Sequence, residues 1–228
     1  MKRAIHKPTV PGIGMAIAAA TVSIALRLDS RGQWLALFVA VLGIGFLAGG
    51  VILRRREPSV LGTAFFAVGT AWMVGSLGIA ISSPPLLTQR IELVPSLLGL
   101  FVLFVGLAPI RRGWERRLVA TGAALLWLGV VTGGVVQNTG PVTLLIAGIA
   151  VVFAWDAAEQ SVSLGRQIGR EAETIRAEVT HGFGTAGVGV GVFIVTALLY
   201  RFGADGLPLG GFVALLVAGF VLAIALRR

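Results

Sequence analysis

The chain contains no cysteine, which excludes disulfide bonds, thiol catalysis and cysteine-ligated iron–sulfur clusters. Charged residues are also scarce: they make up 13% of the chain, whereas an ordinary soluble domain carries about 25%. Hydrophobic residues reach 56%, and the mean hydropathy is +0.92. Because the chain lacks the polar residues that would coat a soluble domain, we predict an integral membrane protein.

Ionisable side chains are missing from every long apolar stretch. The uninterrupted ranges are residues 8–26, 32–53, 58–89, 93–110, 118–155, 182–200 and 206–226. Ionisable residues at membrane depth usually mark proton relays, ion sites or catalytic centres. Intramembrane proteases and proton-coupled carriers need such groups. The sequence therefore predicts no enzyme, no cofactor and no metal site.

These stretches predict an all-α fold, a polytopic transmembrane helix bundle of about eight spans, as a single membrane domain over residues 1–228. Most spans approach the about 20 residues that cross a hydrocarbon core of about 30 Å. The first apolar run follows KRAIHK, as in a signal peptide, but we expect it to be retained as a span. The predicted spans lie near residues 10–27, 33–53, 60–82, 93–110, 118–136, 141–155, 183–200 and 208–226.

The formal charge of +9 is explained by membrane topology rather than by nucleic-acid binding. With eight spans and both termini in the cytoplasm, fifteen of the 19 Lys and Arg residues fall on the inner side. The outer loops hold the other four, Arg27, Arg31, Arg90 and Arg201. Every inner loop is more basic than its neighbours, as cytoplasmic loops are, so the N-terminus and the C-terminus are both predicted to be cytoplasmic.

The 32 glycines are about twice the usual share of about 7% and predict close helix contacts inside the bundle. GFGTAG at residues 182–187 formally matches a dinucleotide motif, but no strand precedes it. A pattern of an apolar span, a basic turn and a small-residue span recurs at residues 51–66 and 107–124. Duplicated hairpins would explain this recurrence, and ordinary membrane composition would explain it as well. Glycines four residues apart occur at Gly45–Gly49, Gly129–Gly133, Gly187–Gly191 and Gly206–Gly210.

Trp155 to His181 is the only long hydrophilic run, and its apolar residues recur every three or four positions. This period predicts one amphipathic cytoplasmic helix over residues 156–180, between spans six and seven. Its net charge of −2 does not indicate binding to anionic lipid. The apolar stripe comprises Leu164, Ile168, Ala172, Ile175 and Val179.

Two groups of candidate site residues lie in this run. The first is a docking surface for a partner protein, with a plain connector helix as the alternative; it comprises Leu164, Ile168, Arg170, Glu171, Ile175 and Arg176. The second is a polar cluster at the inner membrane face, in which Asp156 and Glu159 share a helix face; it comprises Trp155, Asp156, Glu159 and His181.

The same run carries the pattern W-D-x-x-E…L-G-x-Q-x-G-R-E-A-x-T-x-R-A-E…H, from Trp155 to His181. This pattern resembles an uncharacterised family of multi-pass membrane proteins from halophilic archaea. The resemblance implies an accessory role beside ATPase and von Willebrand-type partner proteins. It covers about a tenth of the chain.

Together these observations predict an accessory or scaffold subunit of the cell membrane without catalytic activity, presenting its cytoplasmic helix to a partner protein. The expected partners are membrane lipids and a cytoplasmic or membrane protein, not nucleic acid; a homo-oligomer is possible but not indicated. The alternative is a transporter or channel for a neutral or lipid-like solute. Hydroxyl groups would line the path of this solute. The simpler role of each hydroxyl is a hydrogen bond to the backbone. The candidate residues are Thr63, Thr70, Ser76, Thr121, Thr132 and Thr196.

Overall fold

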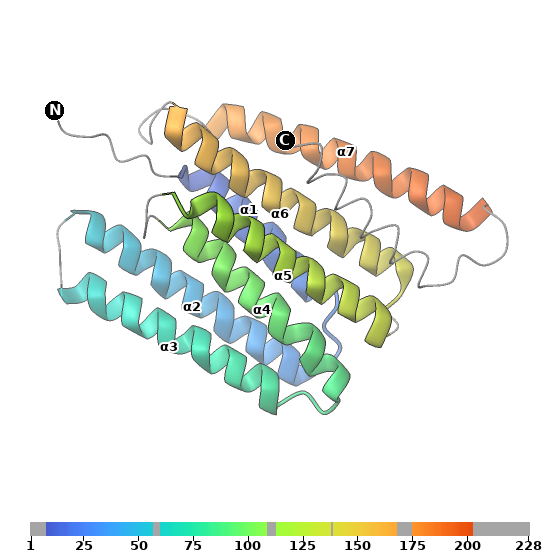
Figure 1. The fold of residues 1–228 in the computed structure, drawn as a ribbon, viewed down its shortest axis with the longest axis horizontal. Helices are drawn as coiled ribbons and strands as arrows, with labels where there is room; N and C mark the ends of the chain where they lie inside the picture. Colours follow the sequence, from blue (N-terminus) through green and yellow to red (C-terminus); the bar gives the residue numbers. More distant parts are fainter. Residues whose placement is uncertain (1–7, 57–59, 109–112, 138, 168–174, 203–228) are drawn as a thin grey trace.

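The computed structural model describes residues 8–56, 60–108, 113–137, 139–167 and 175–202, and every regular element in these ranges is an α-helix (Figure 1). The predicted all-α class is therefore confirmed for the described chain. The predicted eighth span, residues 208–226, lies outside it. The helices are α1 (Val10–Ala25), α2 (Arg31–Arg56), α3 (Val60–Ser82), α4 (Leu87–Leu107), α5 (Glu115–Val136), α6 (Pro141–Gln167) and α7 (Ile175–Phe202).

Six helices of the described chain, α2 to α7, are long and apolar enough to cross a membrane. Helix α1 has 16 residues and extends about 24 Å, so it is shorter than the predicted first span. Large apolar side chains cover the outside of the bundle, including Trp34 (51% exposed), Phe38 (61%) and Val74 (64%). Exposed apolar surface of this extent marks contact with lipid or with other proteins.

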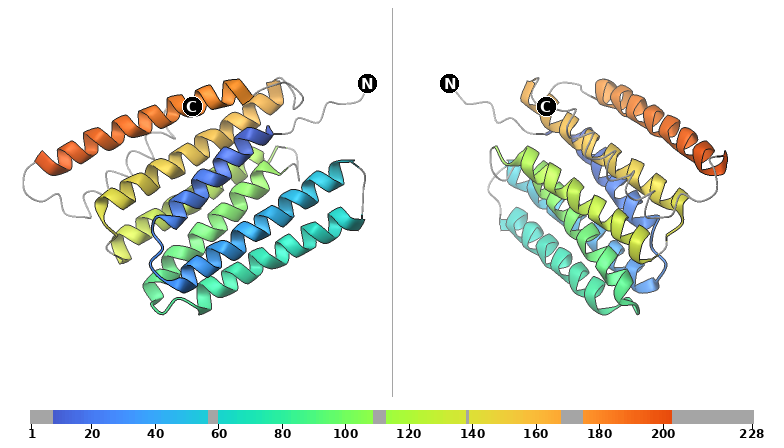
Figure 2. Two further views of the ribbon diagram at one scale, coloured as in Figure 1. Left: turned by 180° about the vertical axis from the view of Figure 1, so that it is seen from behind. Right: turned by 45° about the vertical axis from the view of Figure 1, so that its right-hand side comes forward.

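Successive helices run in opposite directions, so the connections alternate between two ends of the bundle (Figures 1 and 2). We call the end at which α1, α3, α5 and α7 begin the basic end, because Arg116, Arg117, Arg166 and Arg176 lie there. The other is the opposite end. The cytoplasmic placement of the basic end stays a prediction of the loop charges.

Helices α2 and α3 form a hairpin in which glycines bring the two backbones together. A Cβ added to Gly50 would lie 3.0 Å from the Gly62 carbonyl oxygen, and one added to Gly43 would lie 3.1 Å from that of Gly69. On α2, Gly43 and Gly50 are seven residues apart, and on α3 Gly62 and Gly69 have the same spacing. This spacing keeps one face of each helix against its neighbour, as in a coiled coil.

Helices α4 and α5 form a second hairpin with the same spacing. Gly99 faces Gly122, whose carbonyl oxygen would lie 2.8 Å from a Cβ added to Gly99. Gly106 and Gly129 follow seven residues after these two glycines, and both face backbone of the opposing helix. The register differs from that of the first hairpin, because Gly106 faces Val119 and Gly129 faces Ser96 rather than glycines. Duplicated hairpins and ordinary membrane composition therefore both remain explanations.

Helix α4 begins earlier than predicted. The predicted span starts at residue 93, but α4 starts at Leu87 and contains Pro95 in its interior. A proline inside a membrane helix is tolerated when side-chain hydroxyls and neighbouring helices satisfy the freed carbonyls. The carbonyl that Pro95 leaves without a backbone donor is that of Ile91, four residues before it. The adjacent Glu92 carbonyl oxygen accepts a hydrogen bond of 2.9 Å from Ser96 Oγ. Because α4 starts at Leu87, Glu92 lies within the helix rather than in a loop.

The predicted single helix over residues 156–180 is wrong. Helix α6 continues to Gln167, α7 begins at Ile175, and the two run antiparallel at the edge of the bundle (Figure 1). The run is therefore divided between a helix end and a helix start that lie side by side. The recurrence of apolar residues every three or four positions did not reveal this division, because the end of α6 and the start of α7 both keep helical spacing. Residues 168–174, between the two helices, lie outside the described chain.

Candidate functional site

The predicted polar cluster is partly assembled at the basic end, where α6 and α7 meet. Asp156 Oδ2 lies 2.8 Å from His181 Nε2 and accepts a hydrogen bond of 2.7 Å from Thr185 Oγ1. The His181 side chain is 42% exposed and that of Asp156 17% exposed. Two sequence-predicted residues are therefore brought together, and Thr185 was missed.

The other two members of the cluster point elsewhere. Glu159 faces α5, where its Oε2 lies 3.6 Å from Arg116 Nε, and Trp155 is buried in the core. Asp156 and Glu159 thus engage different partners in spite of their helical spacing. No group of three or more metal-ligating side chains gathers within the described ranges.

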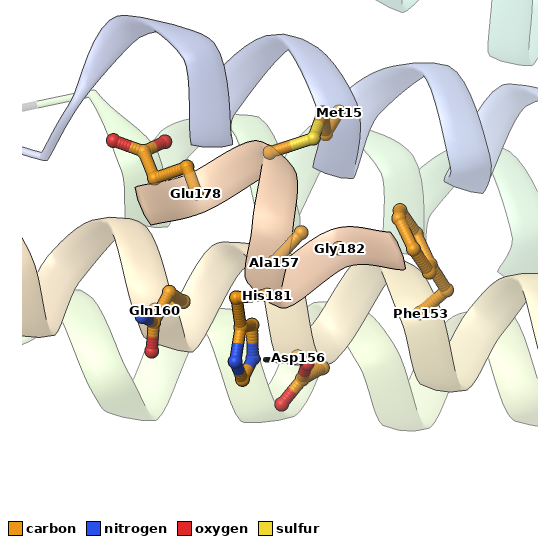
Figure 3. A pocket seen from close by; sticks show the side chains of 8 residues that line it. All are labelled: Met15, Phe153, Asp156, Ala157, Gln160, Glu178, His181 and Gly182. Atoms are coloured by element: carbon orange, nitrogen blue, oxygen red, sulfur yellow. Dashed lines mark hydrogen bonds and ion pairs between the residues drawn. The ribbon is translucent and has the colours of Figure 1, made fainter. Parts of the chain in front are cut away.

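A pocket of about 10 Å³ lies beside the Asp156–His181 pair, between α1, α6 and α7. This volume suits about one water-sized group. Figure 3 shows Asp156 and His181 pointing to one side, whereas the Glu178 carboxylate points toward α1. The pocket is lined by Met15, Phe153, Asp156, Ala157, Gln160, Glu178, His181 and Gly182.

The predicted docking residues divide between described and undescribed parts of the chain. Ile175 is 62% exposed, Arg176 is exposed, and Leu164 is half-buried on α6. Ile168, Arg170 and Glu171 lie outside the described residues. Val179, one turn after Ile175, is 39% exposed, so α7 keeps an apolar stripe on its surface at the basic end.

Three of the six hydroxyls of the alternative solute path bind carbonyl oxygens of their own helices. Thr70 Oγ1 donates to the Phe66 carbonyl oxygen at 2.9 Å, and Ser76 Oγ donates to that of Met73 at 2.7 Å. Thr132 Oγ1 donates to Leu128 in the same way. Such bonds are the simpler role expected of these hydroxyls, and the solute path stays a prediction.

A second polar site, which the sequence analysis missed, is buried at the opposite end. Arg27 and Glu92 form an ion pair whose side chains are 1% and 2% exposed. Arg27 was predicted in an outer loop, but it follows α1 directly and turns into the bundle. Gln137, the residue after α5, donates to the second Glu92 oxygen. The network therefore joins α1, α4 and the end of α5.

Four of the five N–H donors of the guanidinium have partners, the Glu92 carboxylate being one of them. Arg27 Nε donates to the Ser23 carbonyl oxygen at 3.0 Å, Nη1 to that of Gly129 at 2.8 Å, and Nη2 to Ser96 Oγ at 3.2 Å. Buried charges are tolerated when they are paired and hydrogen-bonded in this way.

Glycines of α5 make room for this ion pair. A Cβ added to Gly129 would overlap Ser96 Oγ, and one added to Gly133 would lie 2.9 Å from Glu92 Oε1. The Gly129–Gly133 spacing thus serves packing within the bundle, as predicted. By contrast, a Cβ at Gly187 or Gly191 would meet nothing within 4 Å in the described chain.

The bundle of long apolar helices, with its ion pair buried and satisfied inside, indicates a multi-helix membrane protein. Residues 67–223 match a family of unknown function, DUF7519, and the chain belongs to this family. No curated protein and no solved structure matches it. The hydrophilic run from Trp155 to His181 lies inside the matched region.

Proposed function

We propose that this protein is a non-catalytic accessory or scaffold subunit of the cell membrane. It presents the basic ends of α6 and α7 to a cytoplasmic partner protein. The observation that carries the proposal is the pairing of Asp156 with His181 and Thr185, which holds the two helix ends together. That pairing displays Ile175 and Arg176 on the surface.

The length of the two helices supports this role. With 27 and 28 residues, α6 and α7 extend about 40 Å, about 10 Å more than the hydrocarbon core requires. The charged residues of α6, Asp156, Glu159 and Arg166, all lie toward the basic end, so the excess length is found there.

The character of the exposed residues fits protein recognition. Interfaces combine apolar anchors with arginine, and truncating such anchors often costs more than about 1 kcal/mol of binding free energy. Ile175 supplies an apolar anchor and Arg176 a charged neighbour. The partner that the sequence resemblance implies is an ATPase or a von Willebrand-type protein.

The test is affinity purification from native membranes in mild detergent, with the partner quantified by mass spectrometry. The variant Ile175→Ser/Arg176→Ala should reduce recovery of a stoichiometric partner about tenfold or more, equivalent to about 1.4 kcal/mol. Val188→Ser is the matched control, because Val188 lies on α7 with 68% exposure but farther from the basic end. Equal recovery by both variants, or no stoichiometric partner with the unaltered protein, would contradict the proposal.

A further inference from the structure

The acidic residues at the basic end of the described chain are all paired within the bundle or buried in it. They are Glu115, Asp156, Glu159 and Glu178. Glu178 is 1% exposed. The other three carboxylates each pair with a basic side chain of the bundle. This end of the described chain therefore presents little free acidic surface.

In each of these three pairs the basic side chain is the more exposed member. Arg116 is 55% exposed beside Glu159 at 21%, and Arg166 is 40% exposed beside Glu115 at 13%. The third pair, at Asp156, shows the same order. In both arginine pairs the carboxylate lies beneath the guanidinium group, so the outward side of the pair is positively charged.

Two further arginines at the same end have no acidic partner within the described ranges. Arg117, in the first turn of α5, and Arg176, in the first turn of α7, are both exposed. Helix α6 packs between α5 and α7 and carries Arg166 near its end (Figure 1). Three neighbouring helices therefore share one positively charged surface, which we call the arginine surface. It comprises Arg116, Arg117, Arg166 and Arg176.

Apolar side chains accompany the arginine surface on α7. Ile175 is 62% exposed and Val179 is 39% exposed, and they are four residues apart, so they share a face of the helix beside Arg176. Protein interfaces are enriched in arginine, and a guanidinium group binds a carboxylate through two parallel hydrogen bonds. A surface of this kind is complementary to acidic side chains that surround an apolar contact.

We propose that the cytoplasmic partner binds the arginine surface through aspartate and glutamate residues, with an apolar side chain on Ile175. This inference rests on the proposed function and specifies the charge of the partner. Lipid headgroups can also be negatively charged. However, Arg166 is the penultimate residue of α6, in the part of the helix that exceeds the hydrocarbon core, and this position favours a partner in the aqueous phase.

The experiment is a zero-length crosslink made in native membranes with the full-length chain. Arg117→Lys and Arg176→Lys each keep the positive charge and supply an amine, which a carbodiimide joins to a neighbouring carboxylate. After affinity purification, mass spectrometry should find both positions joined to Asp or Glu residues of the stoichiometric partner. Arg31→Lys is the matched control, because Arg31 is exposed at the opposite end and should give no crosslink to that partner.

A second measurement follows the recovery of the partner at different salt concentrations. The screening length of charges falls from about 10 Å at 0.1 M salt to about 3 Å at 1 M, so recovery with the unaltered protein should fall about fivefold or more between these concentrations of NaCl. The variant Arg117→Glu/Arg176→Glu should reduce recovery about tenfold at the lower concentration, because like charges then face each other. Arg31→Glu should leave recovery unchanged.

The outcomes separate this inference from the proposed function. A partner that is recovered equally at both salt concentrations and by the Arg117→Glu/Arg176→Glu variant would overturn the inference and leave the proposed function intact. If that variant loses a bound anionic lipid but keeps the partner, the arginine surface binds lipid and the inference is overturned as well. If the unaltered protein recovers no stoichiometric partner at the lower salt concentration, both proposals fail.

Discussion

The ion pair between Arg27 and Glu92 gives the sharpest test of how the bundle is held together. Replacing Glu92 by Ala leaves the guanidinium of Arg27 inside the bundle, with only the neutral acceptors Ser23, Ser96 and Gly129. Because both side chains of the pair are at most 2% exposed, water does not replace the lost carboxylate. Removing one partner of a buried pair costs about 3–5 kcal/mol.

The converse variant, Arg27→Met, leaves the carboxylate of Glu92 with Gln137 as its side-chain donor. We expect a cost of the same size for this change. For a chain of this length, 1 kcal/mol corresponds to about 2–4 °C in the melting temperature. Each single variant should therefore melt about 6–20 °C below the unaltered protein in mild detergent.

The double variant Arg27→Met/Glu92→Leu separates electrostatics from packing. It removes both charges and fills a similar volume with apolar atoms, a change that is often neutral or stabilising. Its melting temperature should therefore exceed that of Arg27→Met and that of the single variant Glu92→Leu, which together form a strongly non-additive cycle. If the decreases in melting temperature of the single variants simply add in the double variant, the two side chains do not depend on each other and the reasoning is refuted. Single variants that melt within 2 °C of the unaltered protein would refute it as well.

Two further predictions follow from the packing and the loop charges. Gly129→Ala should destabilise the protein by about 1–3 kcal/mol, because the new methyl group overlaps Ser96 Oγ. Gly75→Ala, where a Cβ meets nothing within 4 Å, should keep or raise the melting temperature; equal effects of the two changes would contradict the close packing. Because the chain has no cysteine, Gly140→Cys and Arg117→Cys provide single labelling sites at the opposite and the basic end. An impermeant maleimide added to intact cells should label only Gly140→Cys; the reverse result would invert the predicted orientation.

The sequence predicted the helices well where apolar length decides the outcome. The predicted third span, residues 60–82, coincides with α3, and the predicted fifth ends with α5 at Val136. These segments are apolar throughout, and a membrane helix satisfies its own backbone hydrogen bonds without help from a partner. Length and hydropathy are therefore enough to locate them.

The buried ion pair could not be located in that way. Arg27 and Glu92 each stand directly beside an apolar stretch, so a count of charges in the spans places both outside. The deciding feature is that α4 passes through Pro95 and starts at Leu87, which brings Glu92 inside. One signal was present in the sequence: an acidic and a basic residue border apolar stretches on the same predicted side of the membrane.

The seven-residue spacing of glycines in both hairpins was also present in the sequence and was not used. Only the four-residue spacing was considered, and that spacing at Gly187–Gly191 has no described neighbour within 4 Å. A heptad keeps small residues on one face along two full turns, whereas a single four-residue pair occurs by chance in a glycine-rich chain. In the two hairpins the seven-residue recurrence marks the faces that pack, whereas Gly184 and Gly191 share this spacing and a Cβ at either would meet nothing within 4 Å in the described chain.

The two buried carboxylates of the described chain meet opposite ends of α1. Glu178 lies at the N-terminal turn of α1, and Arg27, the partner of Glu92, follows its C-terminal end and donates to the Ser23 carbonyl oxygen. A helix dipole favours negative charge at the N-terminus and positive charge at the C-terminus, so α1 stabilises both placements. Such an interaction contributes at most about 2 kcal/mol, which is less than the cost of an uncompensated buried charge. The dipole thus explains why Glu178 lies at that end of α1, although its contribution is smaller than that of the ion pair at the other end.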